Sequence, residues 1–221
     1  MSARPCFADR RDAGRRLATR LAGFAAADPL VLALPRGGVP VAFEVAQALR
    51  APLDLVMVRK IGAPGMEEFG IGAVVDGHDP QVVLDKEGMR LVQPPPGYVE
   101  AEVRRQLQEI ERRRRTYLPG REPPAVGGRT VIVVDDGIAT GNTARAALRA
   151  LRRNRPGHLV LGAPVAEAGM AGTLAAEADE VVVLYAPPRL SSVGEHYADF
   201  TQTTDAEVIR LLEASRAPAP M

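Results

Sequence analysis

The chain has 221 residues, of which 46% are hydrophobic and 25% are charged, values typical of a globular protein with a sizeable core. Its 28 basic and 27 acidic residues nearly cancel, which argues against a protein that wraps nucleic acid, and no apolar run reaches the roughly 18 residues of a membrane span. The single cysteine, Cys6, excludes an intrachain disulfide and a cysteine-based zinc site. We therefore expect a cytoplasmic protein that binds neither nucleic acid nor membrane.

The N-terminal half combines helices with strands of different kinds. The predicted elements are a helix over 7–22, a strand over 30–34, a helix from about 39, a strand over 53–58, two short β-like runs over 69–75 and 81–84, and a long helix over 98–117. The run Leu30–Leu34 is apolar throughout, which predicts a strand buried on both faces. Between the second strand and the β-like runs, Gly62–Gly65 predicts a mobile loop.

The C-terminal half alternates strands with helices. The predicted elements are strands over 130–134, 159–163 and 180–184, and helices over 143–153 and 167–178. This alternation predicts a parallel sheet with helices on both faces. A capping box at Thr204 opens a last helix to about Ala214. We expect one domain over 1–216, with a core over 28–185 and a hood formed by 186–203 with the terminal helices, followed by a frayed tail over 217–221.

The most informative segment is a strand followed by two acidic residues and a glycine-containing loop. Val131–Val134 lead into Asp135 and Asp136, and the loop over 137–143 opens a helix. Open α/β sheets bind ligands at the carboxyl ends of their strands, and a loop backed by a helix N-terminus binds anions through backbone N–H groups. Carboxylates suit sugar hydroxyls or Mg²⁺. A phosphate site beside a diol or metal site describes a ribose 5-phosphate.

This segment resembles the phosphoribosyl pyrophosphate (PRPP) loop of type I phosphoribosyltransferases, in which two acids precede Ala-Thr-Gly-x-Thr after an apolar strand. The resemblance implies an α/β fold with a parallel, doubly wound sheet of the type I phosphoribosyltransferase kind, a β-hairpin or flexible-loop insertion and a small hood. It implies that Asp135 and Asp136 contact ribose hydroxyls or hydrated Mg²⁺. The remaining loop residues that it assigns to PRPP are Gly137, Ala139, Thr140, Gly141, Asn142 and Thr143.

Two further stretches carry the resemblance. Arg36, Gly37 and Gly38 follow the first core strand and are similar to the loop that binds pyrophosphate in the family, often around a non-proline cis peptide. Glycine lets the backbone approach oxygens closely, and arginine offers a fork of donors. Arg59 and Lys60 match basic residues that family members place against pyrophosphate, ahead of a flexible loop that closes over the site.

The family's reaction displaces pyrophosphate from C1 of PRPP by a nitrogenous nucleophile, through a transition state that resembles an oxocarbenium ion. The protein mainly positions the reactants and neutralises the leaving group, whose charge Mg²⁺ lowers. The resemblance assigns catalytic roles to Asp135, Asp136, Arg59 and Lys60. It implies PRPP and a small, nucleobase-like acceptor as ligands, Mg²⁺ as the cofactor, a role in nucleotide salvage and a homodimer.

The sequence leaves the identity of the acceptor open. Enzymes for 6-oxopurines carry a carboxylate where this chain has Ala139, yet the loop at Arg36 is similar to that of xanthine–guanine enzymes. The candidate pocket residues lie in the predicted hood and are Ser192, Val193, Tyr197 and Phe200. By resemblance to the hood of purine enzymes, Asp199 is a candidate third ligand of Mg²⁺ beside Asp135 and Asp136.

Two other functions are compatible with an acid pair after a strand. A PRPP-binding regulator or sensor keeps the same loop but does not need the pyrophosphate loop or the basic strand end, and because both are present we favour the enzyme. Phosphohydrolase-like and receiver-like proteins place their acids after the first strand and use a partner lysine. Lys60 and Lys86, the only lysines of this chain, are poorly placed for that role.

Overall fold

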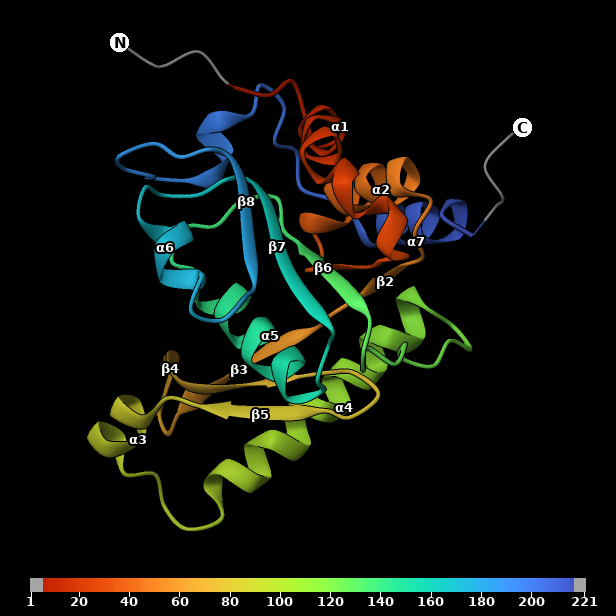
Figure 1. Cartoon of the computed structure of the whole chain (residues 1–221). Helices are drawn as coiled ribbons and strands as arrows, with labels where there is room; N and C mark the ends of the chain where they lie inside the picture. Colours follow the sequence, from red (N-terminus) through yellow and green to blue (C-terminus); the bar gives the residue numbers. More distant parts are fainter. Residues whose placement is uncertain (1–5, 217–221) are drawn as a thin grey trace.

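A computed structural model describes residues 6–216, and its centre is a five-stranded parallel sheet (Figure 1). The strands are β1 (Leu30–Ala33), β2 (Leu53–Leu55), β6 (Thr130–Val134), β7 (His158–Val165) and β8 (Glu180–Tyr185). Their order in the sheet is β2-β1-β6-β7-β8. The strand order therefore reverses between β1 and β6, and such a switch point is where α/β sheets bind ligands.

Helices cover both faces of this sheet, as the alternation of strands and helices predicts. The helices of one face are α1 (Arg10–Leu21), α2 (Gly38–Leu49) and α7 (Asp205–Ala214), and those of the other are α5 (Asn142–Arg153) and α6 (Met170–Leu174). Strand β1 shows why its sequence is apolar throughout. Val31 and Ala33 pack with α1 and α2, whereas Leu30 and Leu32 pack with α5. The prediction of a strand buried on both faces is confirmed.

Between β2 and β6 the chain leaves the parallel sheet and builds an insertion, in the lower part of Figure 1. Its elements are β3 (Val58–Ala63), β4 (Met66–Val75), β5 (Gln81–Leu84), α3 (Lys86–Val92) and α4 (Tyr98–Tyr117). The three strands form an antiparallel sheet. The predicted insertion is present, but the loop predicted over 62–65 is wrong, because Gly62 and Ala63 still pair with β4 and only a tight turn remains. The sequence also did not predict α3.

A buried ion network fastens this insertion to the edge of the parallel sheet. Arg114 of α4 donates to Asp54 of β2 at 2.8 Å and to Asp76, just after β4, at 3.1 Å. Asp76 also accepts a hydrogen bond from the Met57 backbone N–H at 2.6 Å. All three ionic side chains are buried. Burial outweighs these favourable contacts and raises the pKa of Asp76 to about 6.

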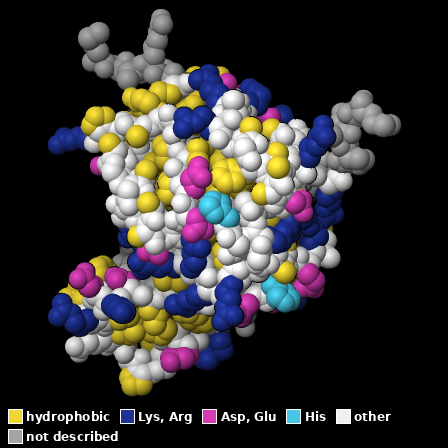
Figure 2. Space-filling view, viewed as in Figure 1, with side chains coloured by type: hydrophobic (Ala, Val, Ile, Leu, Met, Phe, Trp, Pro, Cys, Tyr) yellow, Lys and Arg dark blue, Asp and Glu magenta, His cyan; other side chains and the backbone are white. Residues whose placement is uncertain are grey.

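The outer surface of the insertion is partly apolar. Figure 2 shows hydrophobic side chains among Lys and Arg side chains over this part of the molecule. Met66, Phe69 and Leu91 are 58%, 41% and 76% exposed, so the antiparallel sheet and α3 leave apolar groups open to solvent. Among the residues described, no helix combines the length and the apolarity that crossing a membrane requires.

Several predicted boundaries shift in the structure. The first helix begins at Arg10 rather than at residue 7, because the Asp9 side chain caps it. The helix predicted over 167–178 is α6, only five residues long, followed by turns to Ala178. The predicted hood contains one short 3₁₀ helix, η2 (Val193–His196), and η1 (Ala22–Ala27) extends α1. Thr204 caps α7 as predicted. The predicted frayed tail over 217–221 lies outside the described residues.

Candidate active site

The loops that follow β1 and β6 touch one another. The Leu34 backbone N–H donates to the Val134 carbonyl at 2.9 Å, which continues the pairing of the two strands to their carboxyl ends. A Cβ atom on Gly37 would lie 2.0 Å from Oδ2 of Asp136, and one on Gly38 would lie 2.7 Å from the Val134 carbonyl oxygen. Only glycine allows this approach. The peptide bond before Arg36 is cis, as the family resemblance implies.

The acid pair lies at the carboxyl end of β6, directly beside the β1 loop. Oδ1 of Asp135 accepts a hydrogen bond from the Asp136 backbone N–H at 2.9 Å. Burial and the neighbouring Asp136 carboxylate raise the pKa of Asp135 well above its usual range. A carboxylate in such a place is stabilised by a nearby cation or by hydrogen-bond donors. The site therefore favours a ligand that brings hydroxyl groups or positive charge.

The side chain of Arg10, the first residue of α1, already contacts this acid pair. Its Nε donates to Oδ2 of Asp136 at 2.7 Å, and its Nη1 donates to the Thr201 carbonyl at 2.8 Å. The guanidinium carbon lies 3.8 Å from the centre of the Phe200 ring, a cation–π contact. The side chain is only 11% exposed. Sequence reasoning missed Arg10, because its partner lies 126 residues away along the chain.

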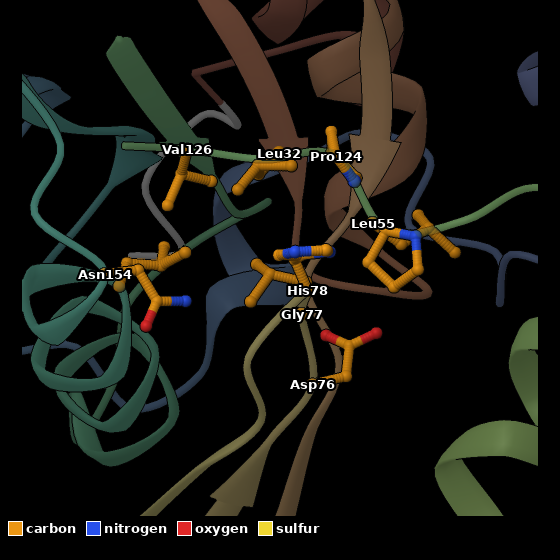
Figure 3. A pocket seen from close by; sticks show the side chains of 11 residues that line it. Leu32, Leu55, Asp76, Gly77, His78, Pro124, Val126 and Asn154 are labelled. Carbon is orange, nitrogen blue, oxygen red and sulfur yellow. The ribbon is translucent and has the colours of Figure 1, made fainter. Parts of the chain in front are cut away.

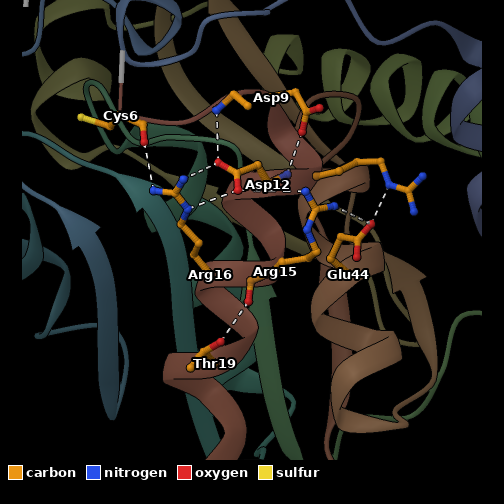
Figure 4. A network of polar contacts seen from close by, with 9 residues as sticks. Cys6, Asp9, Asp12, Arg15, Arg16, Thr19 and Glu44 are labelled. Atoms are coloured by element: carbon orange, nitrogen blue, oxygen red, sulfur yellow. Dashed lines mark hydrogen bonds and ion pairs between the residues drawn. The ribbon is translucent and has the colours of Figure 1, made fainter. Parts of the chain in front are cut away.

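Helix α1 holds Arg10 in place through its own polar contacts, which Figure 4 shows. Oδ1 of Asp9 accepts from the Asp12 backbone N–H at 2.7 Å and so caps the helix. Asp12 pairs with Arg16 one turn later, at 2.8 Å. Arg11 donates to Glu44 of α2 at 2.6 Å. The cap and the ion pairs fix both the start of α1 and its seat on α2, and thereby the origin of the Arg10 side chain.

The predicted phosphate loop presents small residues to solvent and buries its supports. The Ile138 backbone N–H donates to the Val165 carbonyl of β7 at 2.8 Å, and the Ile138 side chain is buried. Gly141 adopts a positive φ of 70° and is the cap residue of α5. The loop residues that face solvent are Ala139, Thr140, Asn142 and Thr143. The positive end of the α5 dipole and the first helical N–H groups thus face an open surface, which suits an anion.

Arg36, predicted to contact pyrophosphate, is paired with the last helix. Its Nη1 lies 3.3 Å from Oδ1 of Asp205 in the first turn of α7. The Tyr117 hydroxyl of α4 donates to the same oxygen at 2.7 Å. The Arg36 and Asp205 side chains are 37% and 56% exposed, so this contact is open to solvent. A half-exposed pair of this kind is weak and can exchange partners.

The two other predicted pyrophosphate contacts lie in the insertion and not at the end of a parallel strand. Arg59 and Lys60 belong to β3 and point to opposite sides of it, because side chains alternate along a strand. Arg59 donates to Gln106 of α4 at 3.0 Å, and burial together with nearby arginines of α4 lowers its pKa. Lys60 donates to the Glu68 side chain at 3.1 Å. Neither residue contacts the acid pair.

Comparison with known proteins decides the family. The profile of the phosphoribosyl transferase domain matches residues 10–192, a stretch that includes both the acid pair and the β1 loop. The chain belongs to the phosphoribosyl transferase family. Two proteins of Mycobacterium tuberculosis, from strains H37Rv and CDC 1551, carry phosphoribosyl transferase names and are each 44% identical to it over 207 residues. That alignment covers 94% of this chain and 46% of each relative, so the chain spans about half their length.

The crystal structure of TT1426 from Thermus thermophilus is also similar to this phosphoribosyl transferase. The two chains are 42% identical, superpose with a TM-score of 0.82, and the match covers 96% of this chain and 99% of that one. A chain of similar length therefore forms the same fold, with the insertion and both terminal helices included in the matched region.

The hood of this phosphoribosyl transferase is built from both ends of the described chain, not from 186–203 and the terminal helices alone. Phe7 forms a β-bridge with Tyr197, in the upper part of Figure 1 where the first and last segments meet. Tyr197 is 5% exposed, and its hydroxyl donates to the Asp136 carbonyl at 2.5 Å. Burial raises the pKa of Tyr197, so the group stays a neutral donor. Tyr197 supports the acid pair from behind.

The other predicted hood residues differ in how they could meet a ligand. Ser192 is exposed, and Val193 is half-buried against Gly137 of the phosphate loop. Phe200 is half-buried, and the Arg10 guanidinium lies over one face of its ring. An acceptor ring can stack on Phe200 only at its remaining surface. Thus Val193 and Phe200 lie near the acid pair, as an acceptor pocket requires, and they remain the candidate pocket residues.

Asp199, the predicted third ligand of Mg²⁺, accepts hydrogen bonds from the backbone and hydroxyl of Thr201 at 2.9 and 2.6 Å. Over residues 6–216, no three His, Cys, Asp or Glu side chains are grouped so as to hold a metal ion. Asp135, Asp136 and Asp199 therefore do not form one metal centre, because the Arg10 guanidinium already occupies Oδ2 of Asp136. The residues fit a Mg²⁺ ion that water and PRPP oxygens hold, rather than three carboxylates.

The enclosed cavity in Figure 3 is not part of this site. It measures about 10 Å³, which is room for one water molecule at most. Its walls include Asp76, His78 and Asn154, together with Val126 from the loop ahead of β6. These residues lie towards the amino end of β6, whereas the acid pair follows its carboxyl end. The candidate active site is instead the open surface above the β1 and β6 loops.

Proposed function

We propose that this chain is a Mg²⁺-dependent phosphoribosyltransferase that transfers ribose 5-phosphate from PRPP to a nitrogenous, nucleobase-like acceptor and releases pyrophosphate. The observation that carries the proposal is the contact between the acid pair and the β1 loop, where a Cβ on Gly37 would collide with the Asp136 carboxylate. A diol-binding pair and a glycine loop that exposes backbone N–H groups meet within one ligand's length. An intact site of this kind fits PRPP as one molecule.

Within the proposal each part of the site takes one part of PRPP. The N-terminus of α5 and the exposed loop residues Thr140 and Thr143 bind the 5′-phosphate. Asp135 and Asp136 accept hydrogen bonds from the ribose hydroxyls, and the β1 loop with Arg36 receives the pyrophosphate. Mg²⁺ bound to PRPP oxygens lowers the charge of the leaving group. Catalysis then rests on positioning and on neutralising pyrophosphate as the C1–O bond breaks.

The catalytic roles of Arg59 and Lys60 require movement of the insertion. Both side chains have partners within it, at Gln106 and Glu68, and would have to exchange these for pyrophosphate oxygens. Closure of a loop or hairpin over bound substrate is a common step in enzymes. We further propose that the protein works as a homodimer in nucleotide salvage in the cytoplasm.

One observation favours a second candidate, a PRPP-binding regulator or sensor. All three predicted pyrophosphate side chains, Arg36, Arg59 and Lys60, hold acceptors within the protein. Ala139 also supplies no acid or base to an acceptor. A protein that binds PRPP without turnover needs neither function.

The deciding experiment incubates the chain with PRPP and Mg²⁺ and a panel of nucleobases and amines, and measures pyrophosphate release. The enzyme predicts release that depends on one acceptor and on Mg²⁺, and that is lost when Asp135→Asn and Asp136→Asn are combined. Calorimetric binding of PRPP without release across the panel supports the sensor. Turnover that persists in the double variant would contradict the proposed site.

A further inference from the structure

The Arg10 side chain is the one cation that touches the acid pair within the described residues. It contributes a charge-assisted hydrogen bond to Asp136 at 2.7 Å, and its other end is held by the Thr201 carbonyl at 2.8 Å. The Phe200 ring covers its flat face at 3.8 Å. Three separate contacts and 11% exposure distinguish it from the solvated arginine pairs elsewhere on the surface.

The Asp136 carboxylate is confined between this guanidinium and the β1 loop. Its Oδ2 atom receives the Arg10 Nε–H and at the same time lies where a side chain on Gly37 would be. Its backbone carbonyl is held by the Tyr197 hydroxyl. The carboxylate can therefore neither rotate away from the loop nor lose its counter-charge without moving α1 or the hood. Oδ1 remains as the acceptor for a ligand.

The charge of Arg10 acts on all of the acids around the site. It lowers the pKa of Asp135 and of Asp199, against the burial and the neighbouring carboxylate that raise the pKa of Asp135. The guanidinium thus stands where three acidic side chains would otherwise face one another. In an acid pair without such a group, a divalent cation takes this position.

We propose that Arg10 is a positioning residue that serves as the built-in cation of the ribose site, in place of a metal ion bound to the acid pair. Its guanidinium holds Asp136 against the β1 loop with one carboxylate oxygen directed to the ribose hydroxyls. Mg²⁺ then enters only with the pyrophosphate of PRPP. The function assigned to the ligand rests on the proposed phosphoribosyltransferase, but the exclusion of a metal from the acid pair does not.

The first test uses Mn²⁺ as a probe and needs no PRPP. Arg10→Met removes the charge but keeps much of the volume, so the vacated acid pair should bind Mn²⁺ at least about tenfold more tightly than the wild type, as measured by calorimetry or electron paramagnetic resonance. The gained site should disappear when Asp136→Asn is added. Arg10→Lys, which restores a cation, should not gain the site.

Arg11→Met is the matched control, because Arg11 also pairs with a carboxylate, Glu44, and also lies near an aromatic ring, Phe43. It loses comparable contacts of α1 and leaves Asp136 untouched, so its Mn²⁺ affinity should equal that of the wild type. Circular dichroism of every variant checks that the fold persists. The proposal is overturned if Arg10→Met gains no Mn²⁺ site, or if wild-type Mn²⁺ affinity already falls in Asp136→Asn.

The second test measures ribose 5-phosphate binding with and without Mg²⁺. Wild type and Arg11→Met should bind it equally well in either condition, whereas Arg10→Met should bind about tenfold more weakly without Mg²⁺ and recover when Mg²⁺ is added. Equal binding by Arg10→Met and wild type would overturn the positioning role. If no variant binds ribose 5-phosphate or PRPP at all, the proposed function fails, and the Mn²⁺ result alone decides whether Arg10 excludes a metal.

Discussion

The acid side and the basic side of the candidate site are built in opposite ways. On the acid side, Asp136 is held by Arg10 from α1, by Tyr197 from the hood and by the approach of Gly37, all within the rigid sheet and its helices. On the basic side, Arg36 and Lys60 point to half-exposed or exposed partners. One side is organised before any ligand arrives. The other must exchange its present partners to receive an anion.

The difference teaches where binding energy and regulation can act. Preorganised groups lose little conformational entropy on binding, so they set affinity and geometry. Weakly paired surface side chains contribute little in the free protein and can change partners at low cost. We therefore expect substitutions on the acid side to affect ribose binding strongly, and substitutions on the basic side to affect pyrophosphate binding in smaller steps.

The strongest effect is expected from the acid pair. Combining Asp135→Asn with Asp136→Asn removes two charged acceptors that each contribute about 1.5–3 kcal/mol to a hydrogen bond, so PRPP affinity in calorimetry should fall about a hundredfold or more. Thermal stability should not fall, because the substitutions relieve the burial and repulsion that raise the pKa of Asp135. The control is Asp28→Asn, an exposed acid with positive φ. Unchanged PRPP affinity in the double variant contradicts the site.

The second prediction concerns the buried network that carries the basic side. The pKa of Asp76 is raised to about 6 in the folded protein, so the folded state binds this proton more tightly than the unfolded chain does. Its stabilising contribution is therefore complete below about pH 4 and declines as pH rises through 6, by about 3 kcal/mol. Relative to Asp76→Asn, the wild type should lose stability over this range in urea unfolding.

Asp179→Asn provides the opposite sign for comparison. The pKa of Asp179 is lowered, first by its hydrogen bond with Arg152, so its contribution is present above its ordinary pKa and declines as pH falls. A wild-type protein whose stability relative to Asp76→Asn is flat from pH 4 to 7 would show that Asp76 does not retain its proton. The insertion would then be anchored by a fully ionised network.

These two regions also differ in how far the sequence predicts them. The strand Val131–Val134, the acid pair and the phosphate loop are contiguous, so their order alone places them at the carboxyl end of a buried strand. The apolar run at Leu30–Leu34 likewise shows burial on both faces. Local patterns of this kind hold because neighbours in the chain remain neighbours in the fold.

Arg10 could not be predicted in this way. It is one of 26 arginines, and its partners Asp136 and Thr201 are 126 and 191 residues away. Only the packing of α1 on α2 brings it to the acid pair. The same limit explains Arg59, which looked like the end of a parallel strand but lies in β3, because the sequence did not show that β2 ends at Leu55.

A third prediction uses the close approach of the two loops. Gly37→Ala keeps a backbone conformation that alanine adopts readily, with φ −59° and ψ −36°, so any effect comes from the Cβ atom and not from backbone strain. That atom would lie 2.0 Å from the Asp136 carboxylate. We expect a loss of about 1–3 kcal/mol in stability and weaker PRPP binding, from denaturant unfolding and calorimetry. Gly23→Ala, whose added Cβ meets nothing within 4 Å, should change neither.

The smallest effect is expected at the exposed pair between the β1 loop and α7. Asp205→Asn removes the charge that holds Arg36, while Tyr117 can still donate to the amide oxygen. Because the pair is 37% and 56% exposed, it contributes less than about 1 kcal/mol. Freeing Arg36 should therefore tighten binding of inorganic pyrophosphate by about two- to fivefold in calorimetry. Glu111→Gln, which removes an exposed partner of Arg115 on α4, serves as the control. Weaker pyrophosphate binding in Asp205→Asn alone would mean that Asp205 holds Arg36 in its binding position, so that the basic side is preorganised as well.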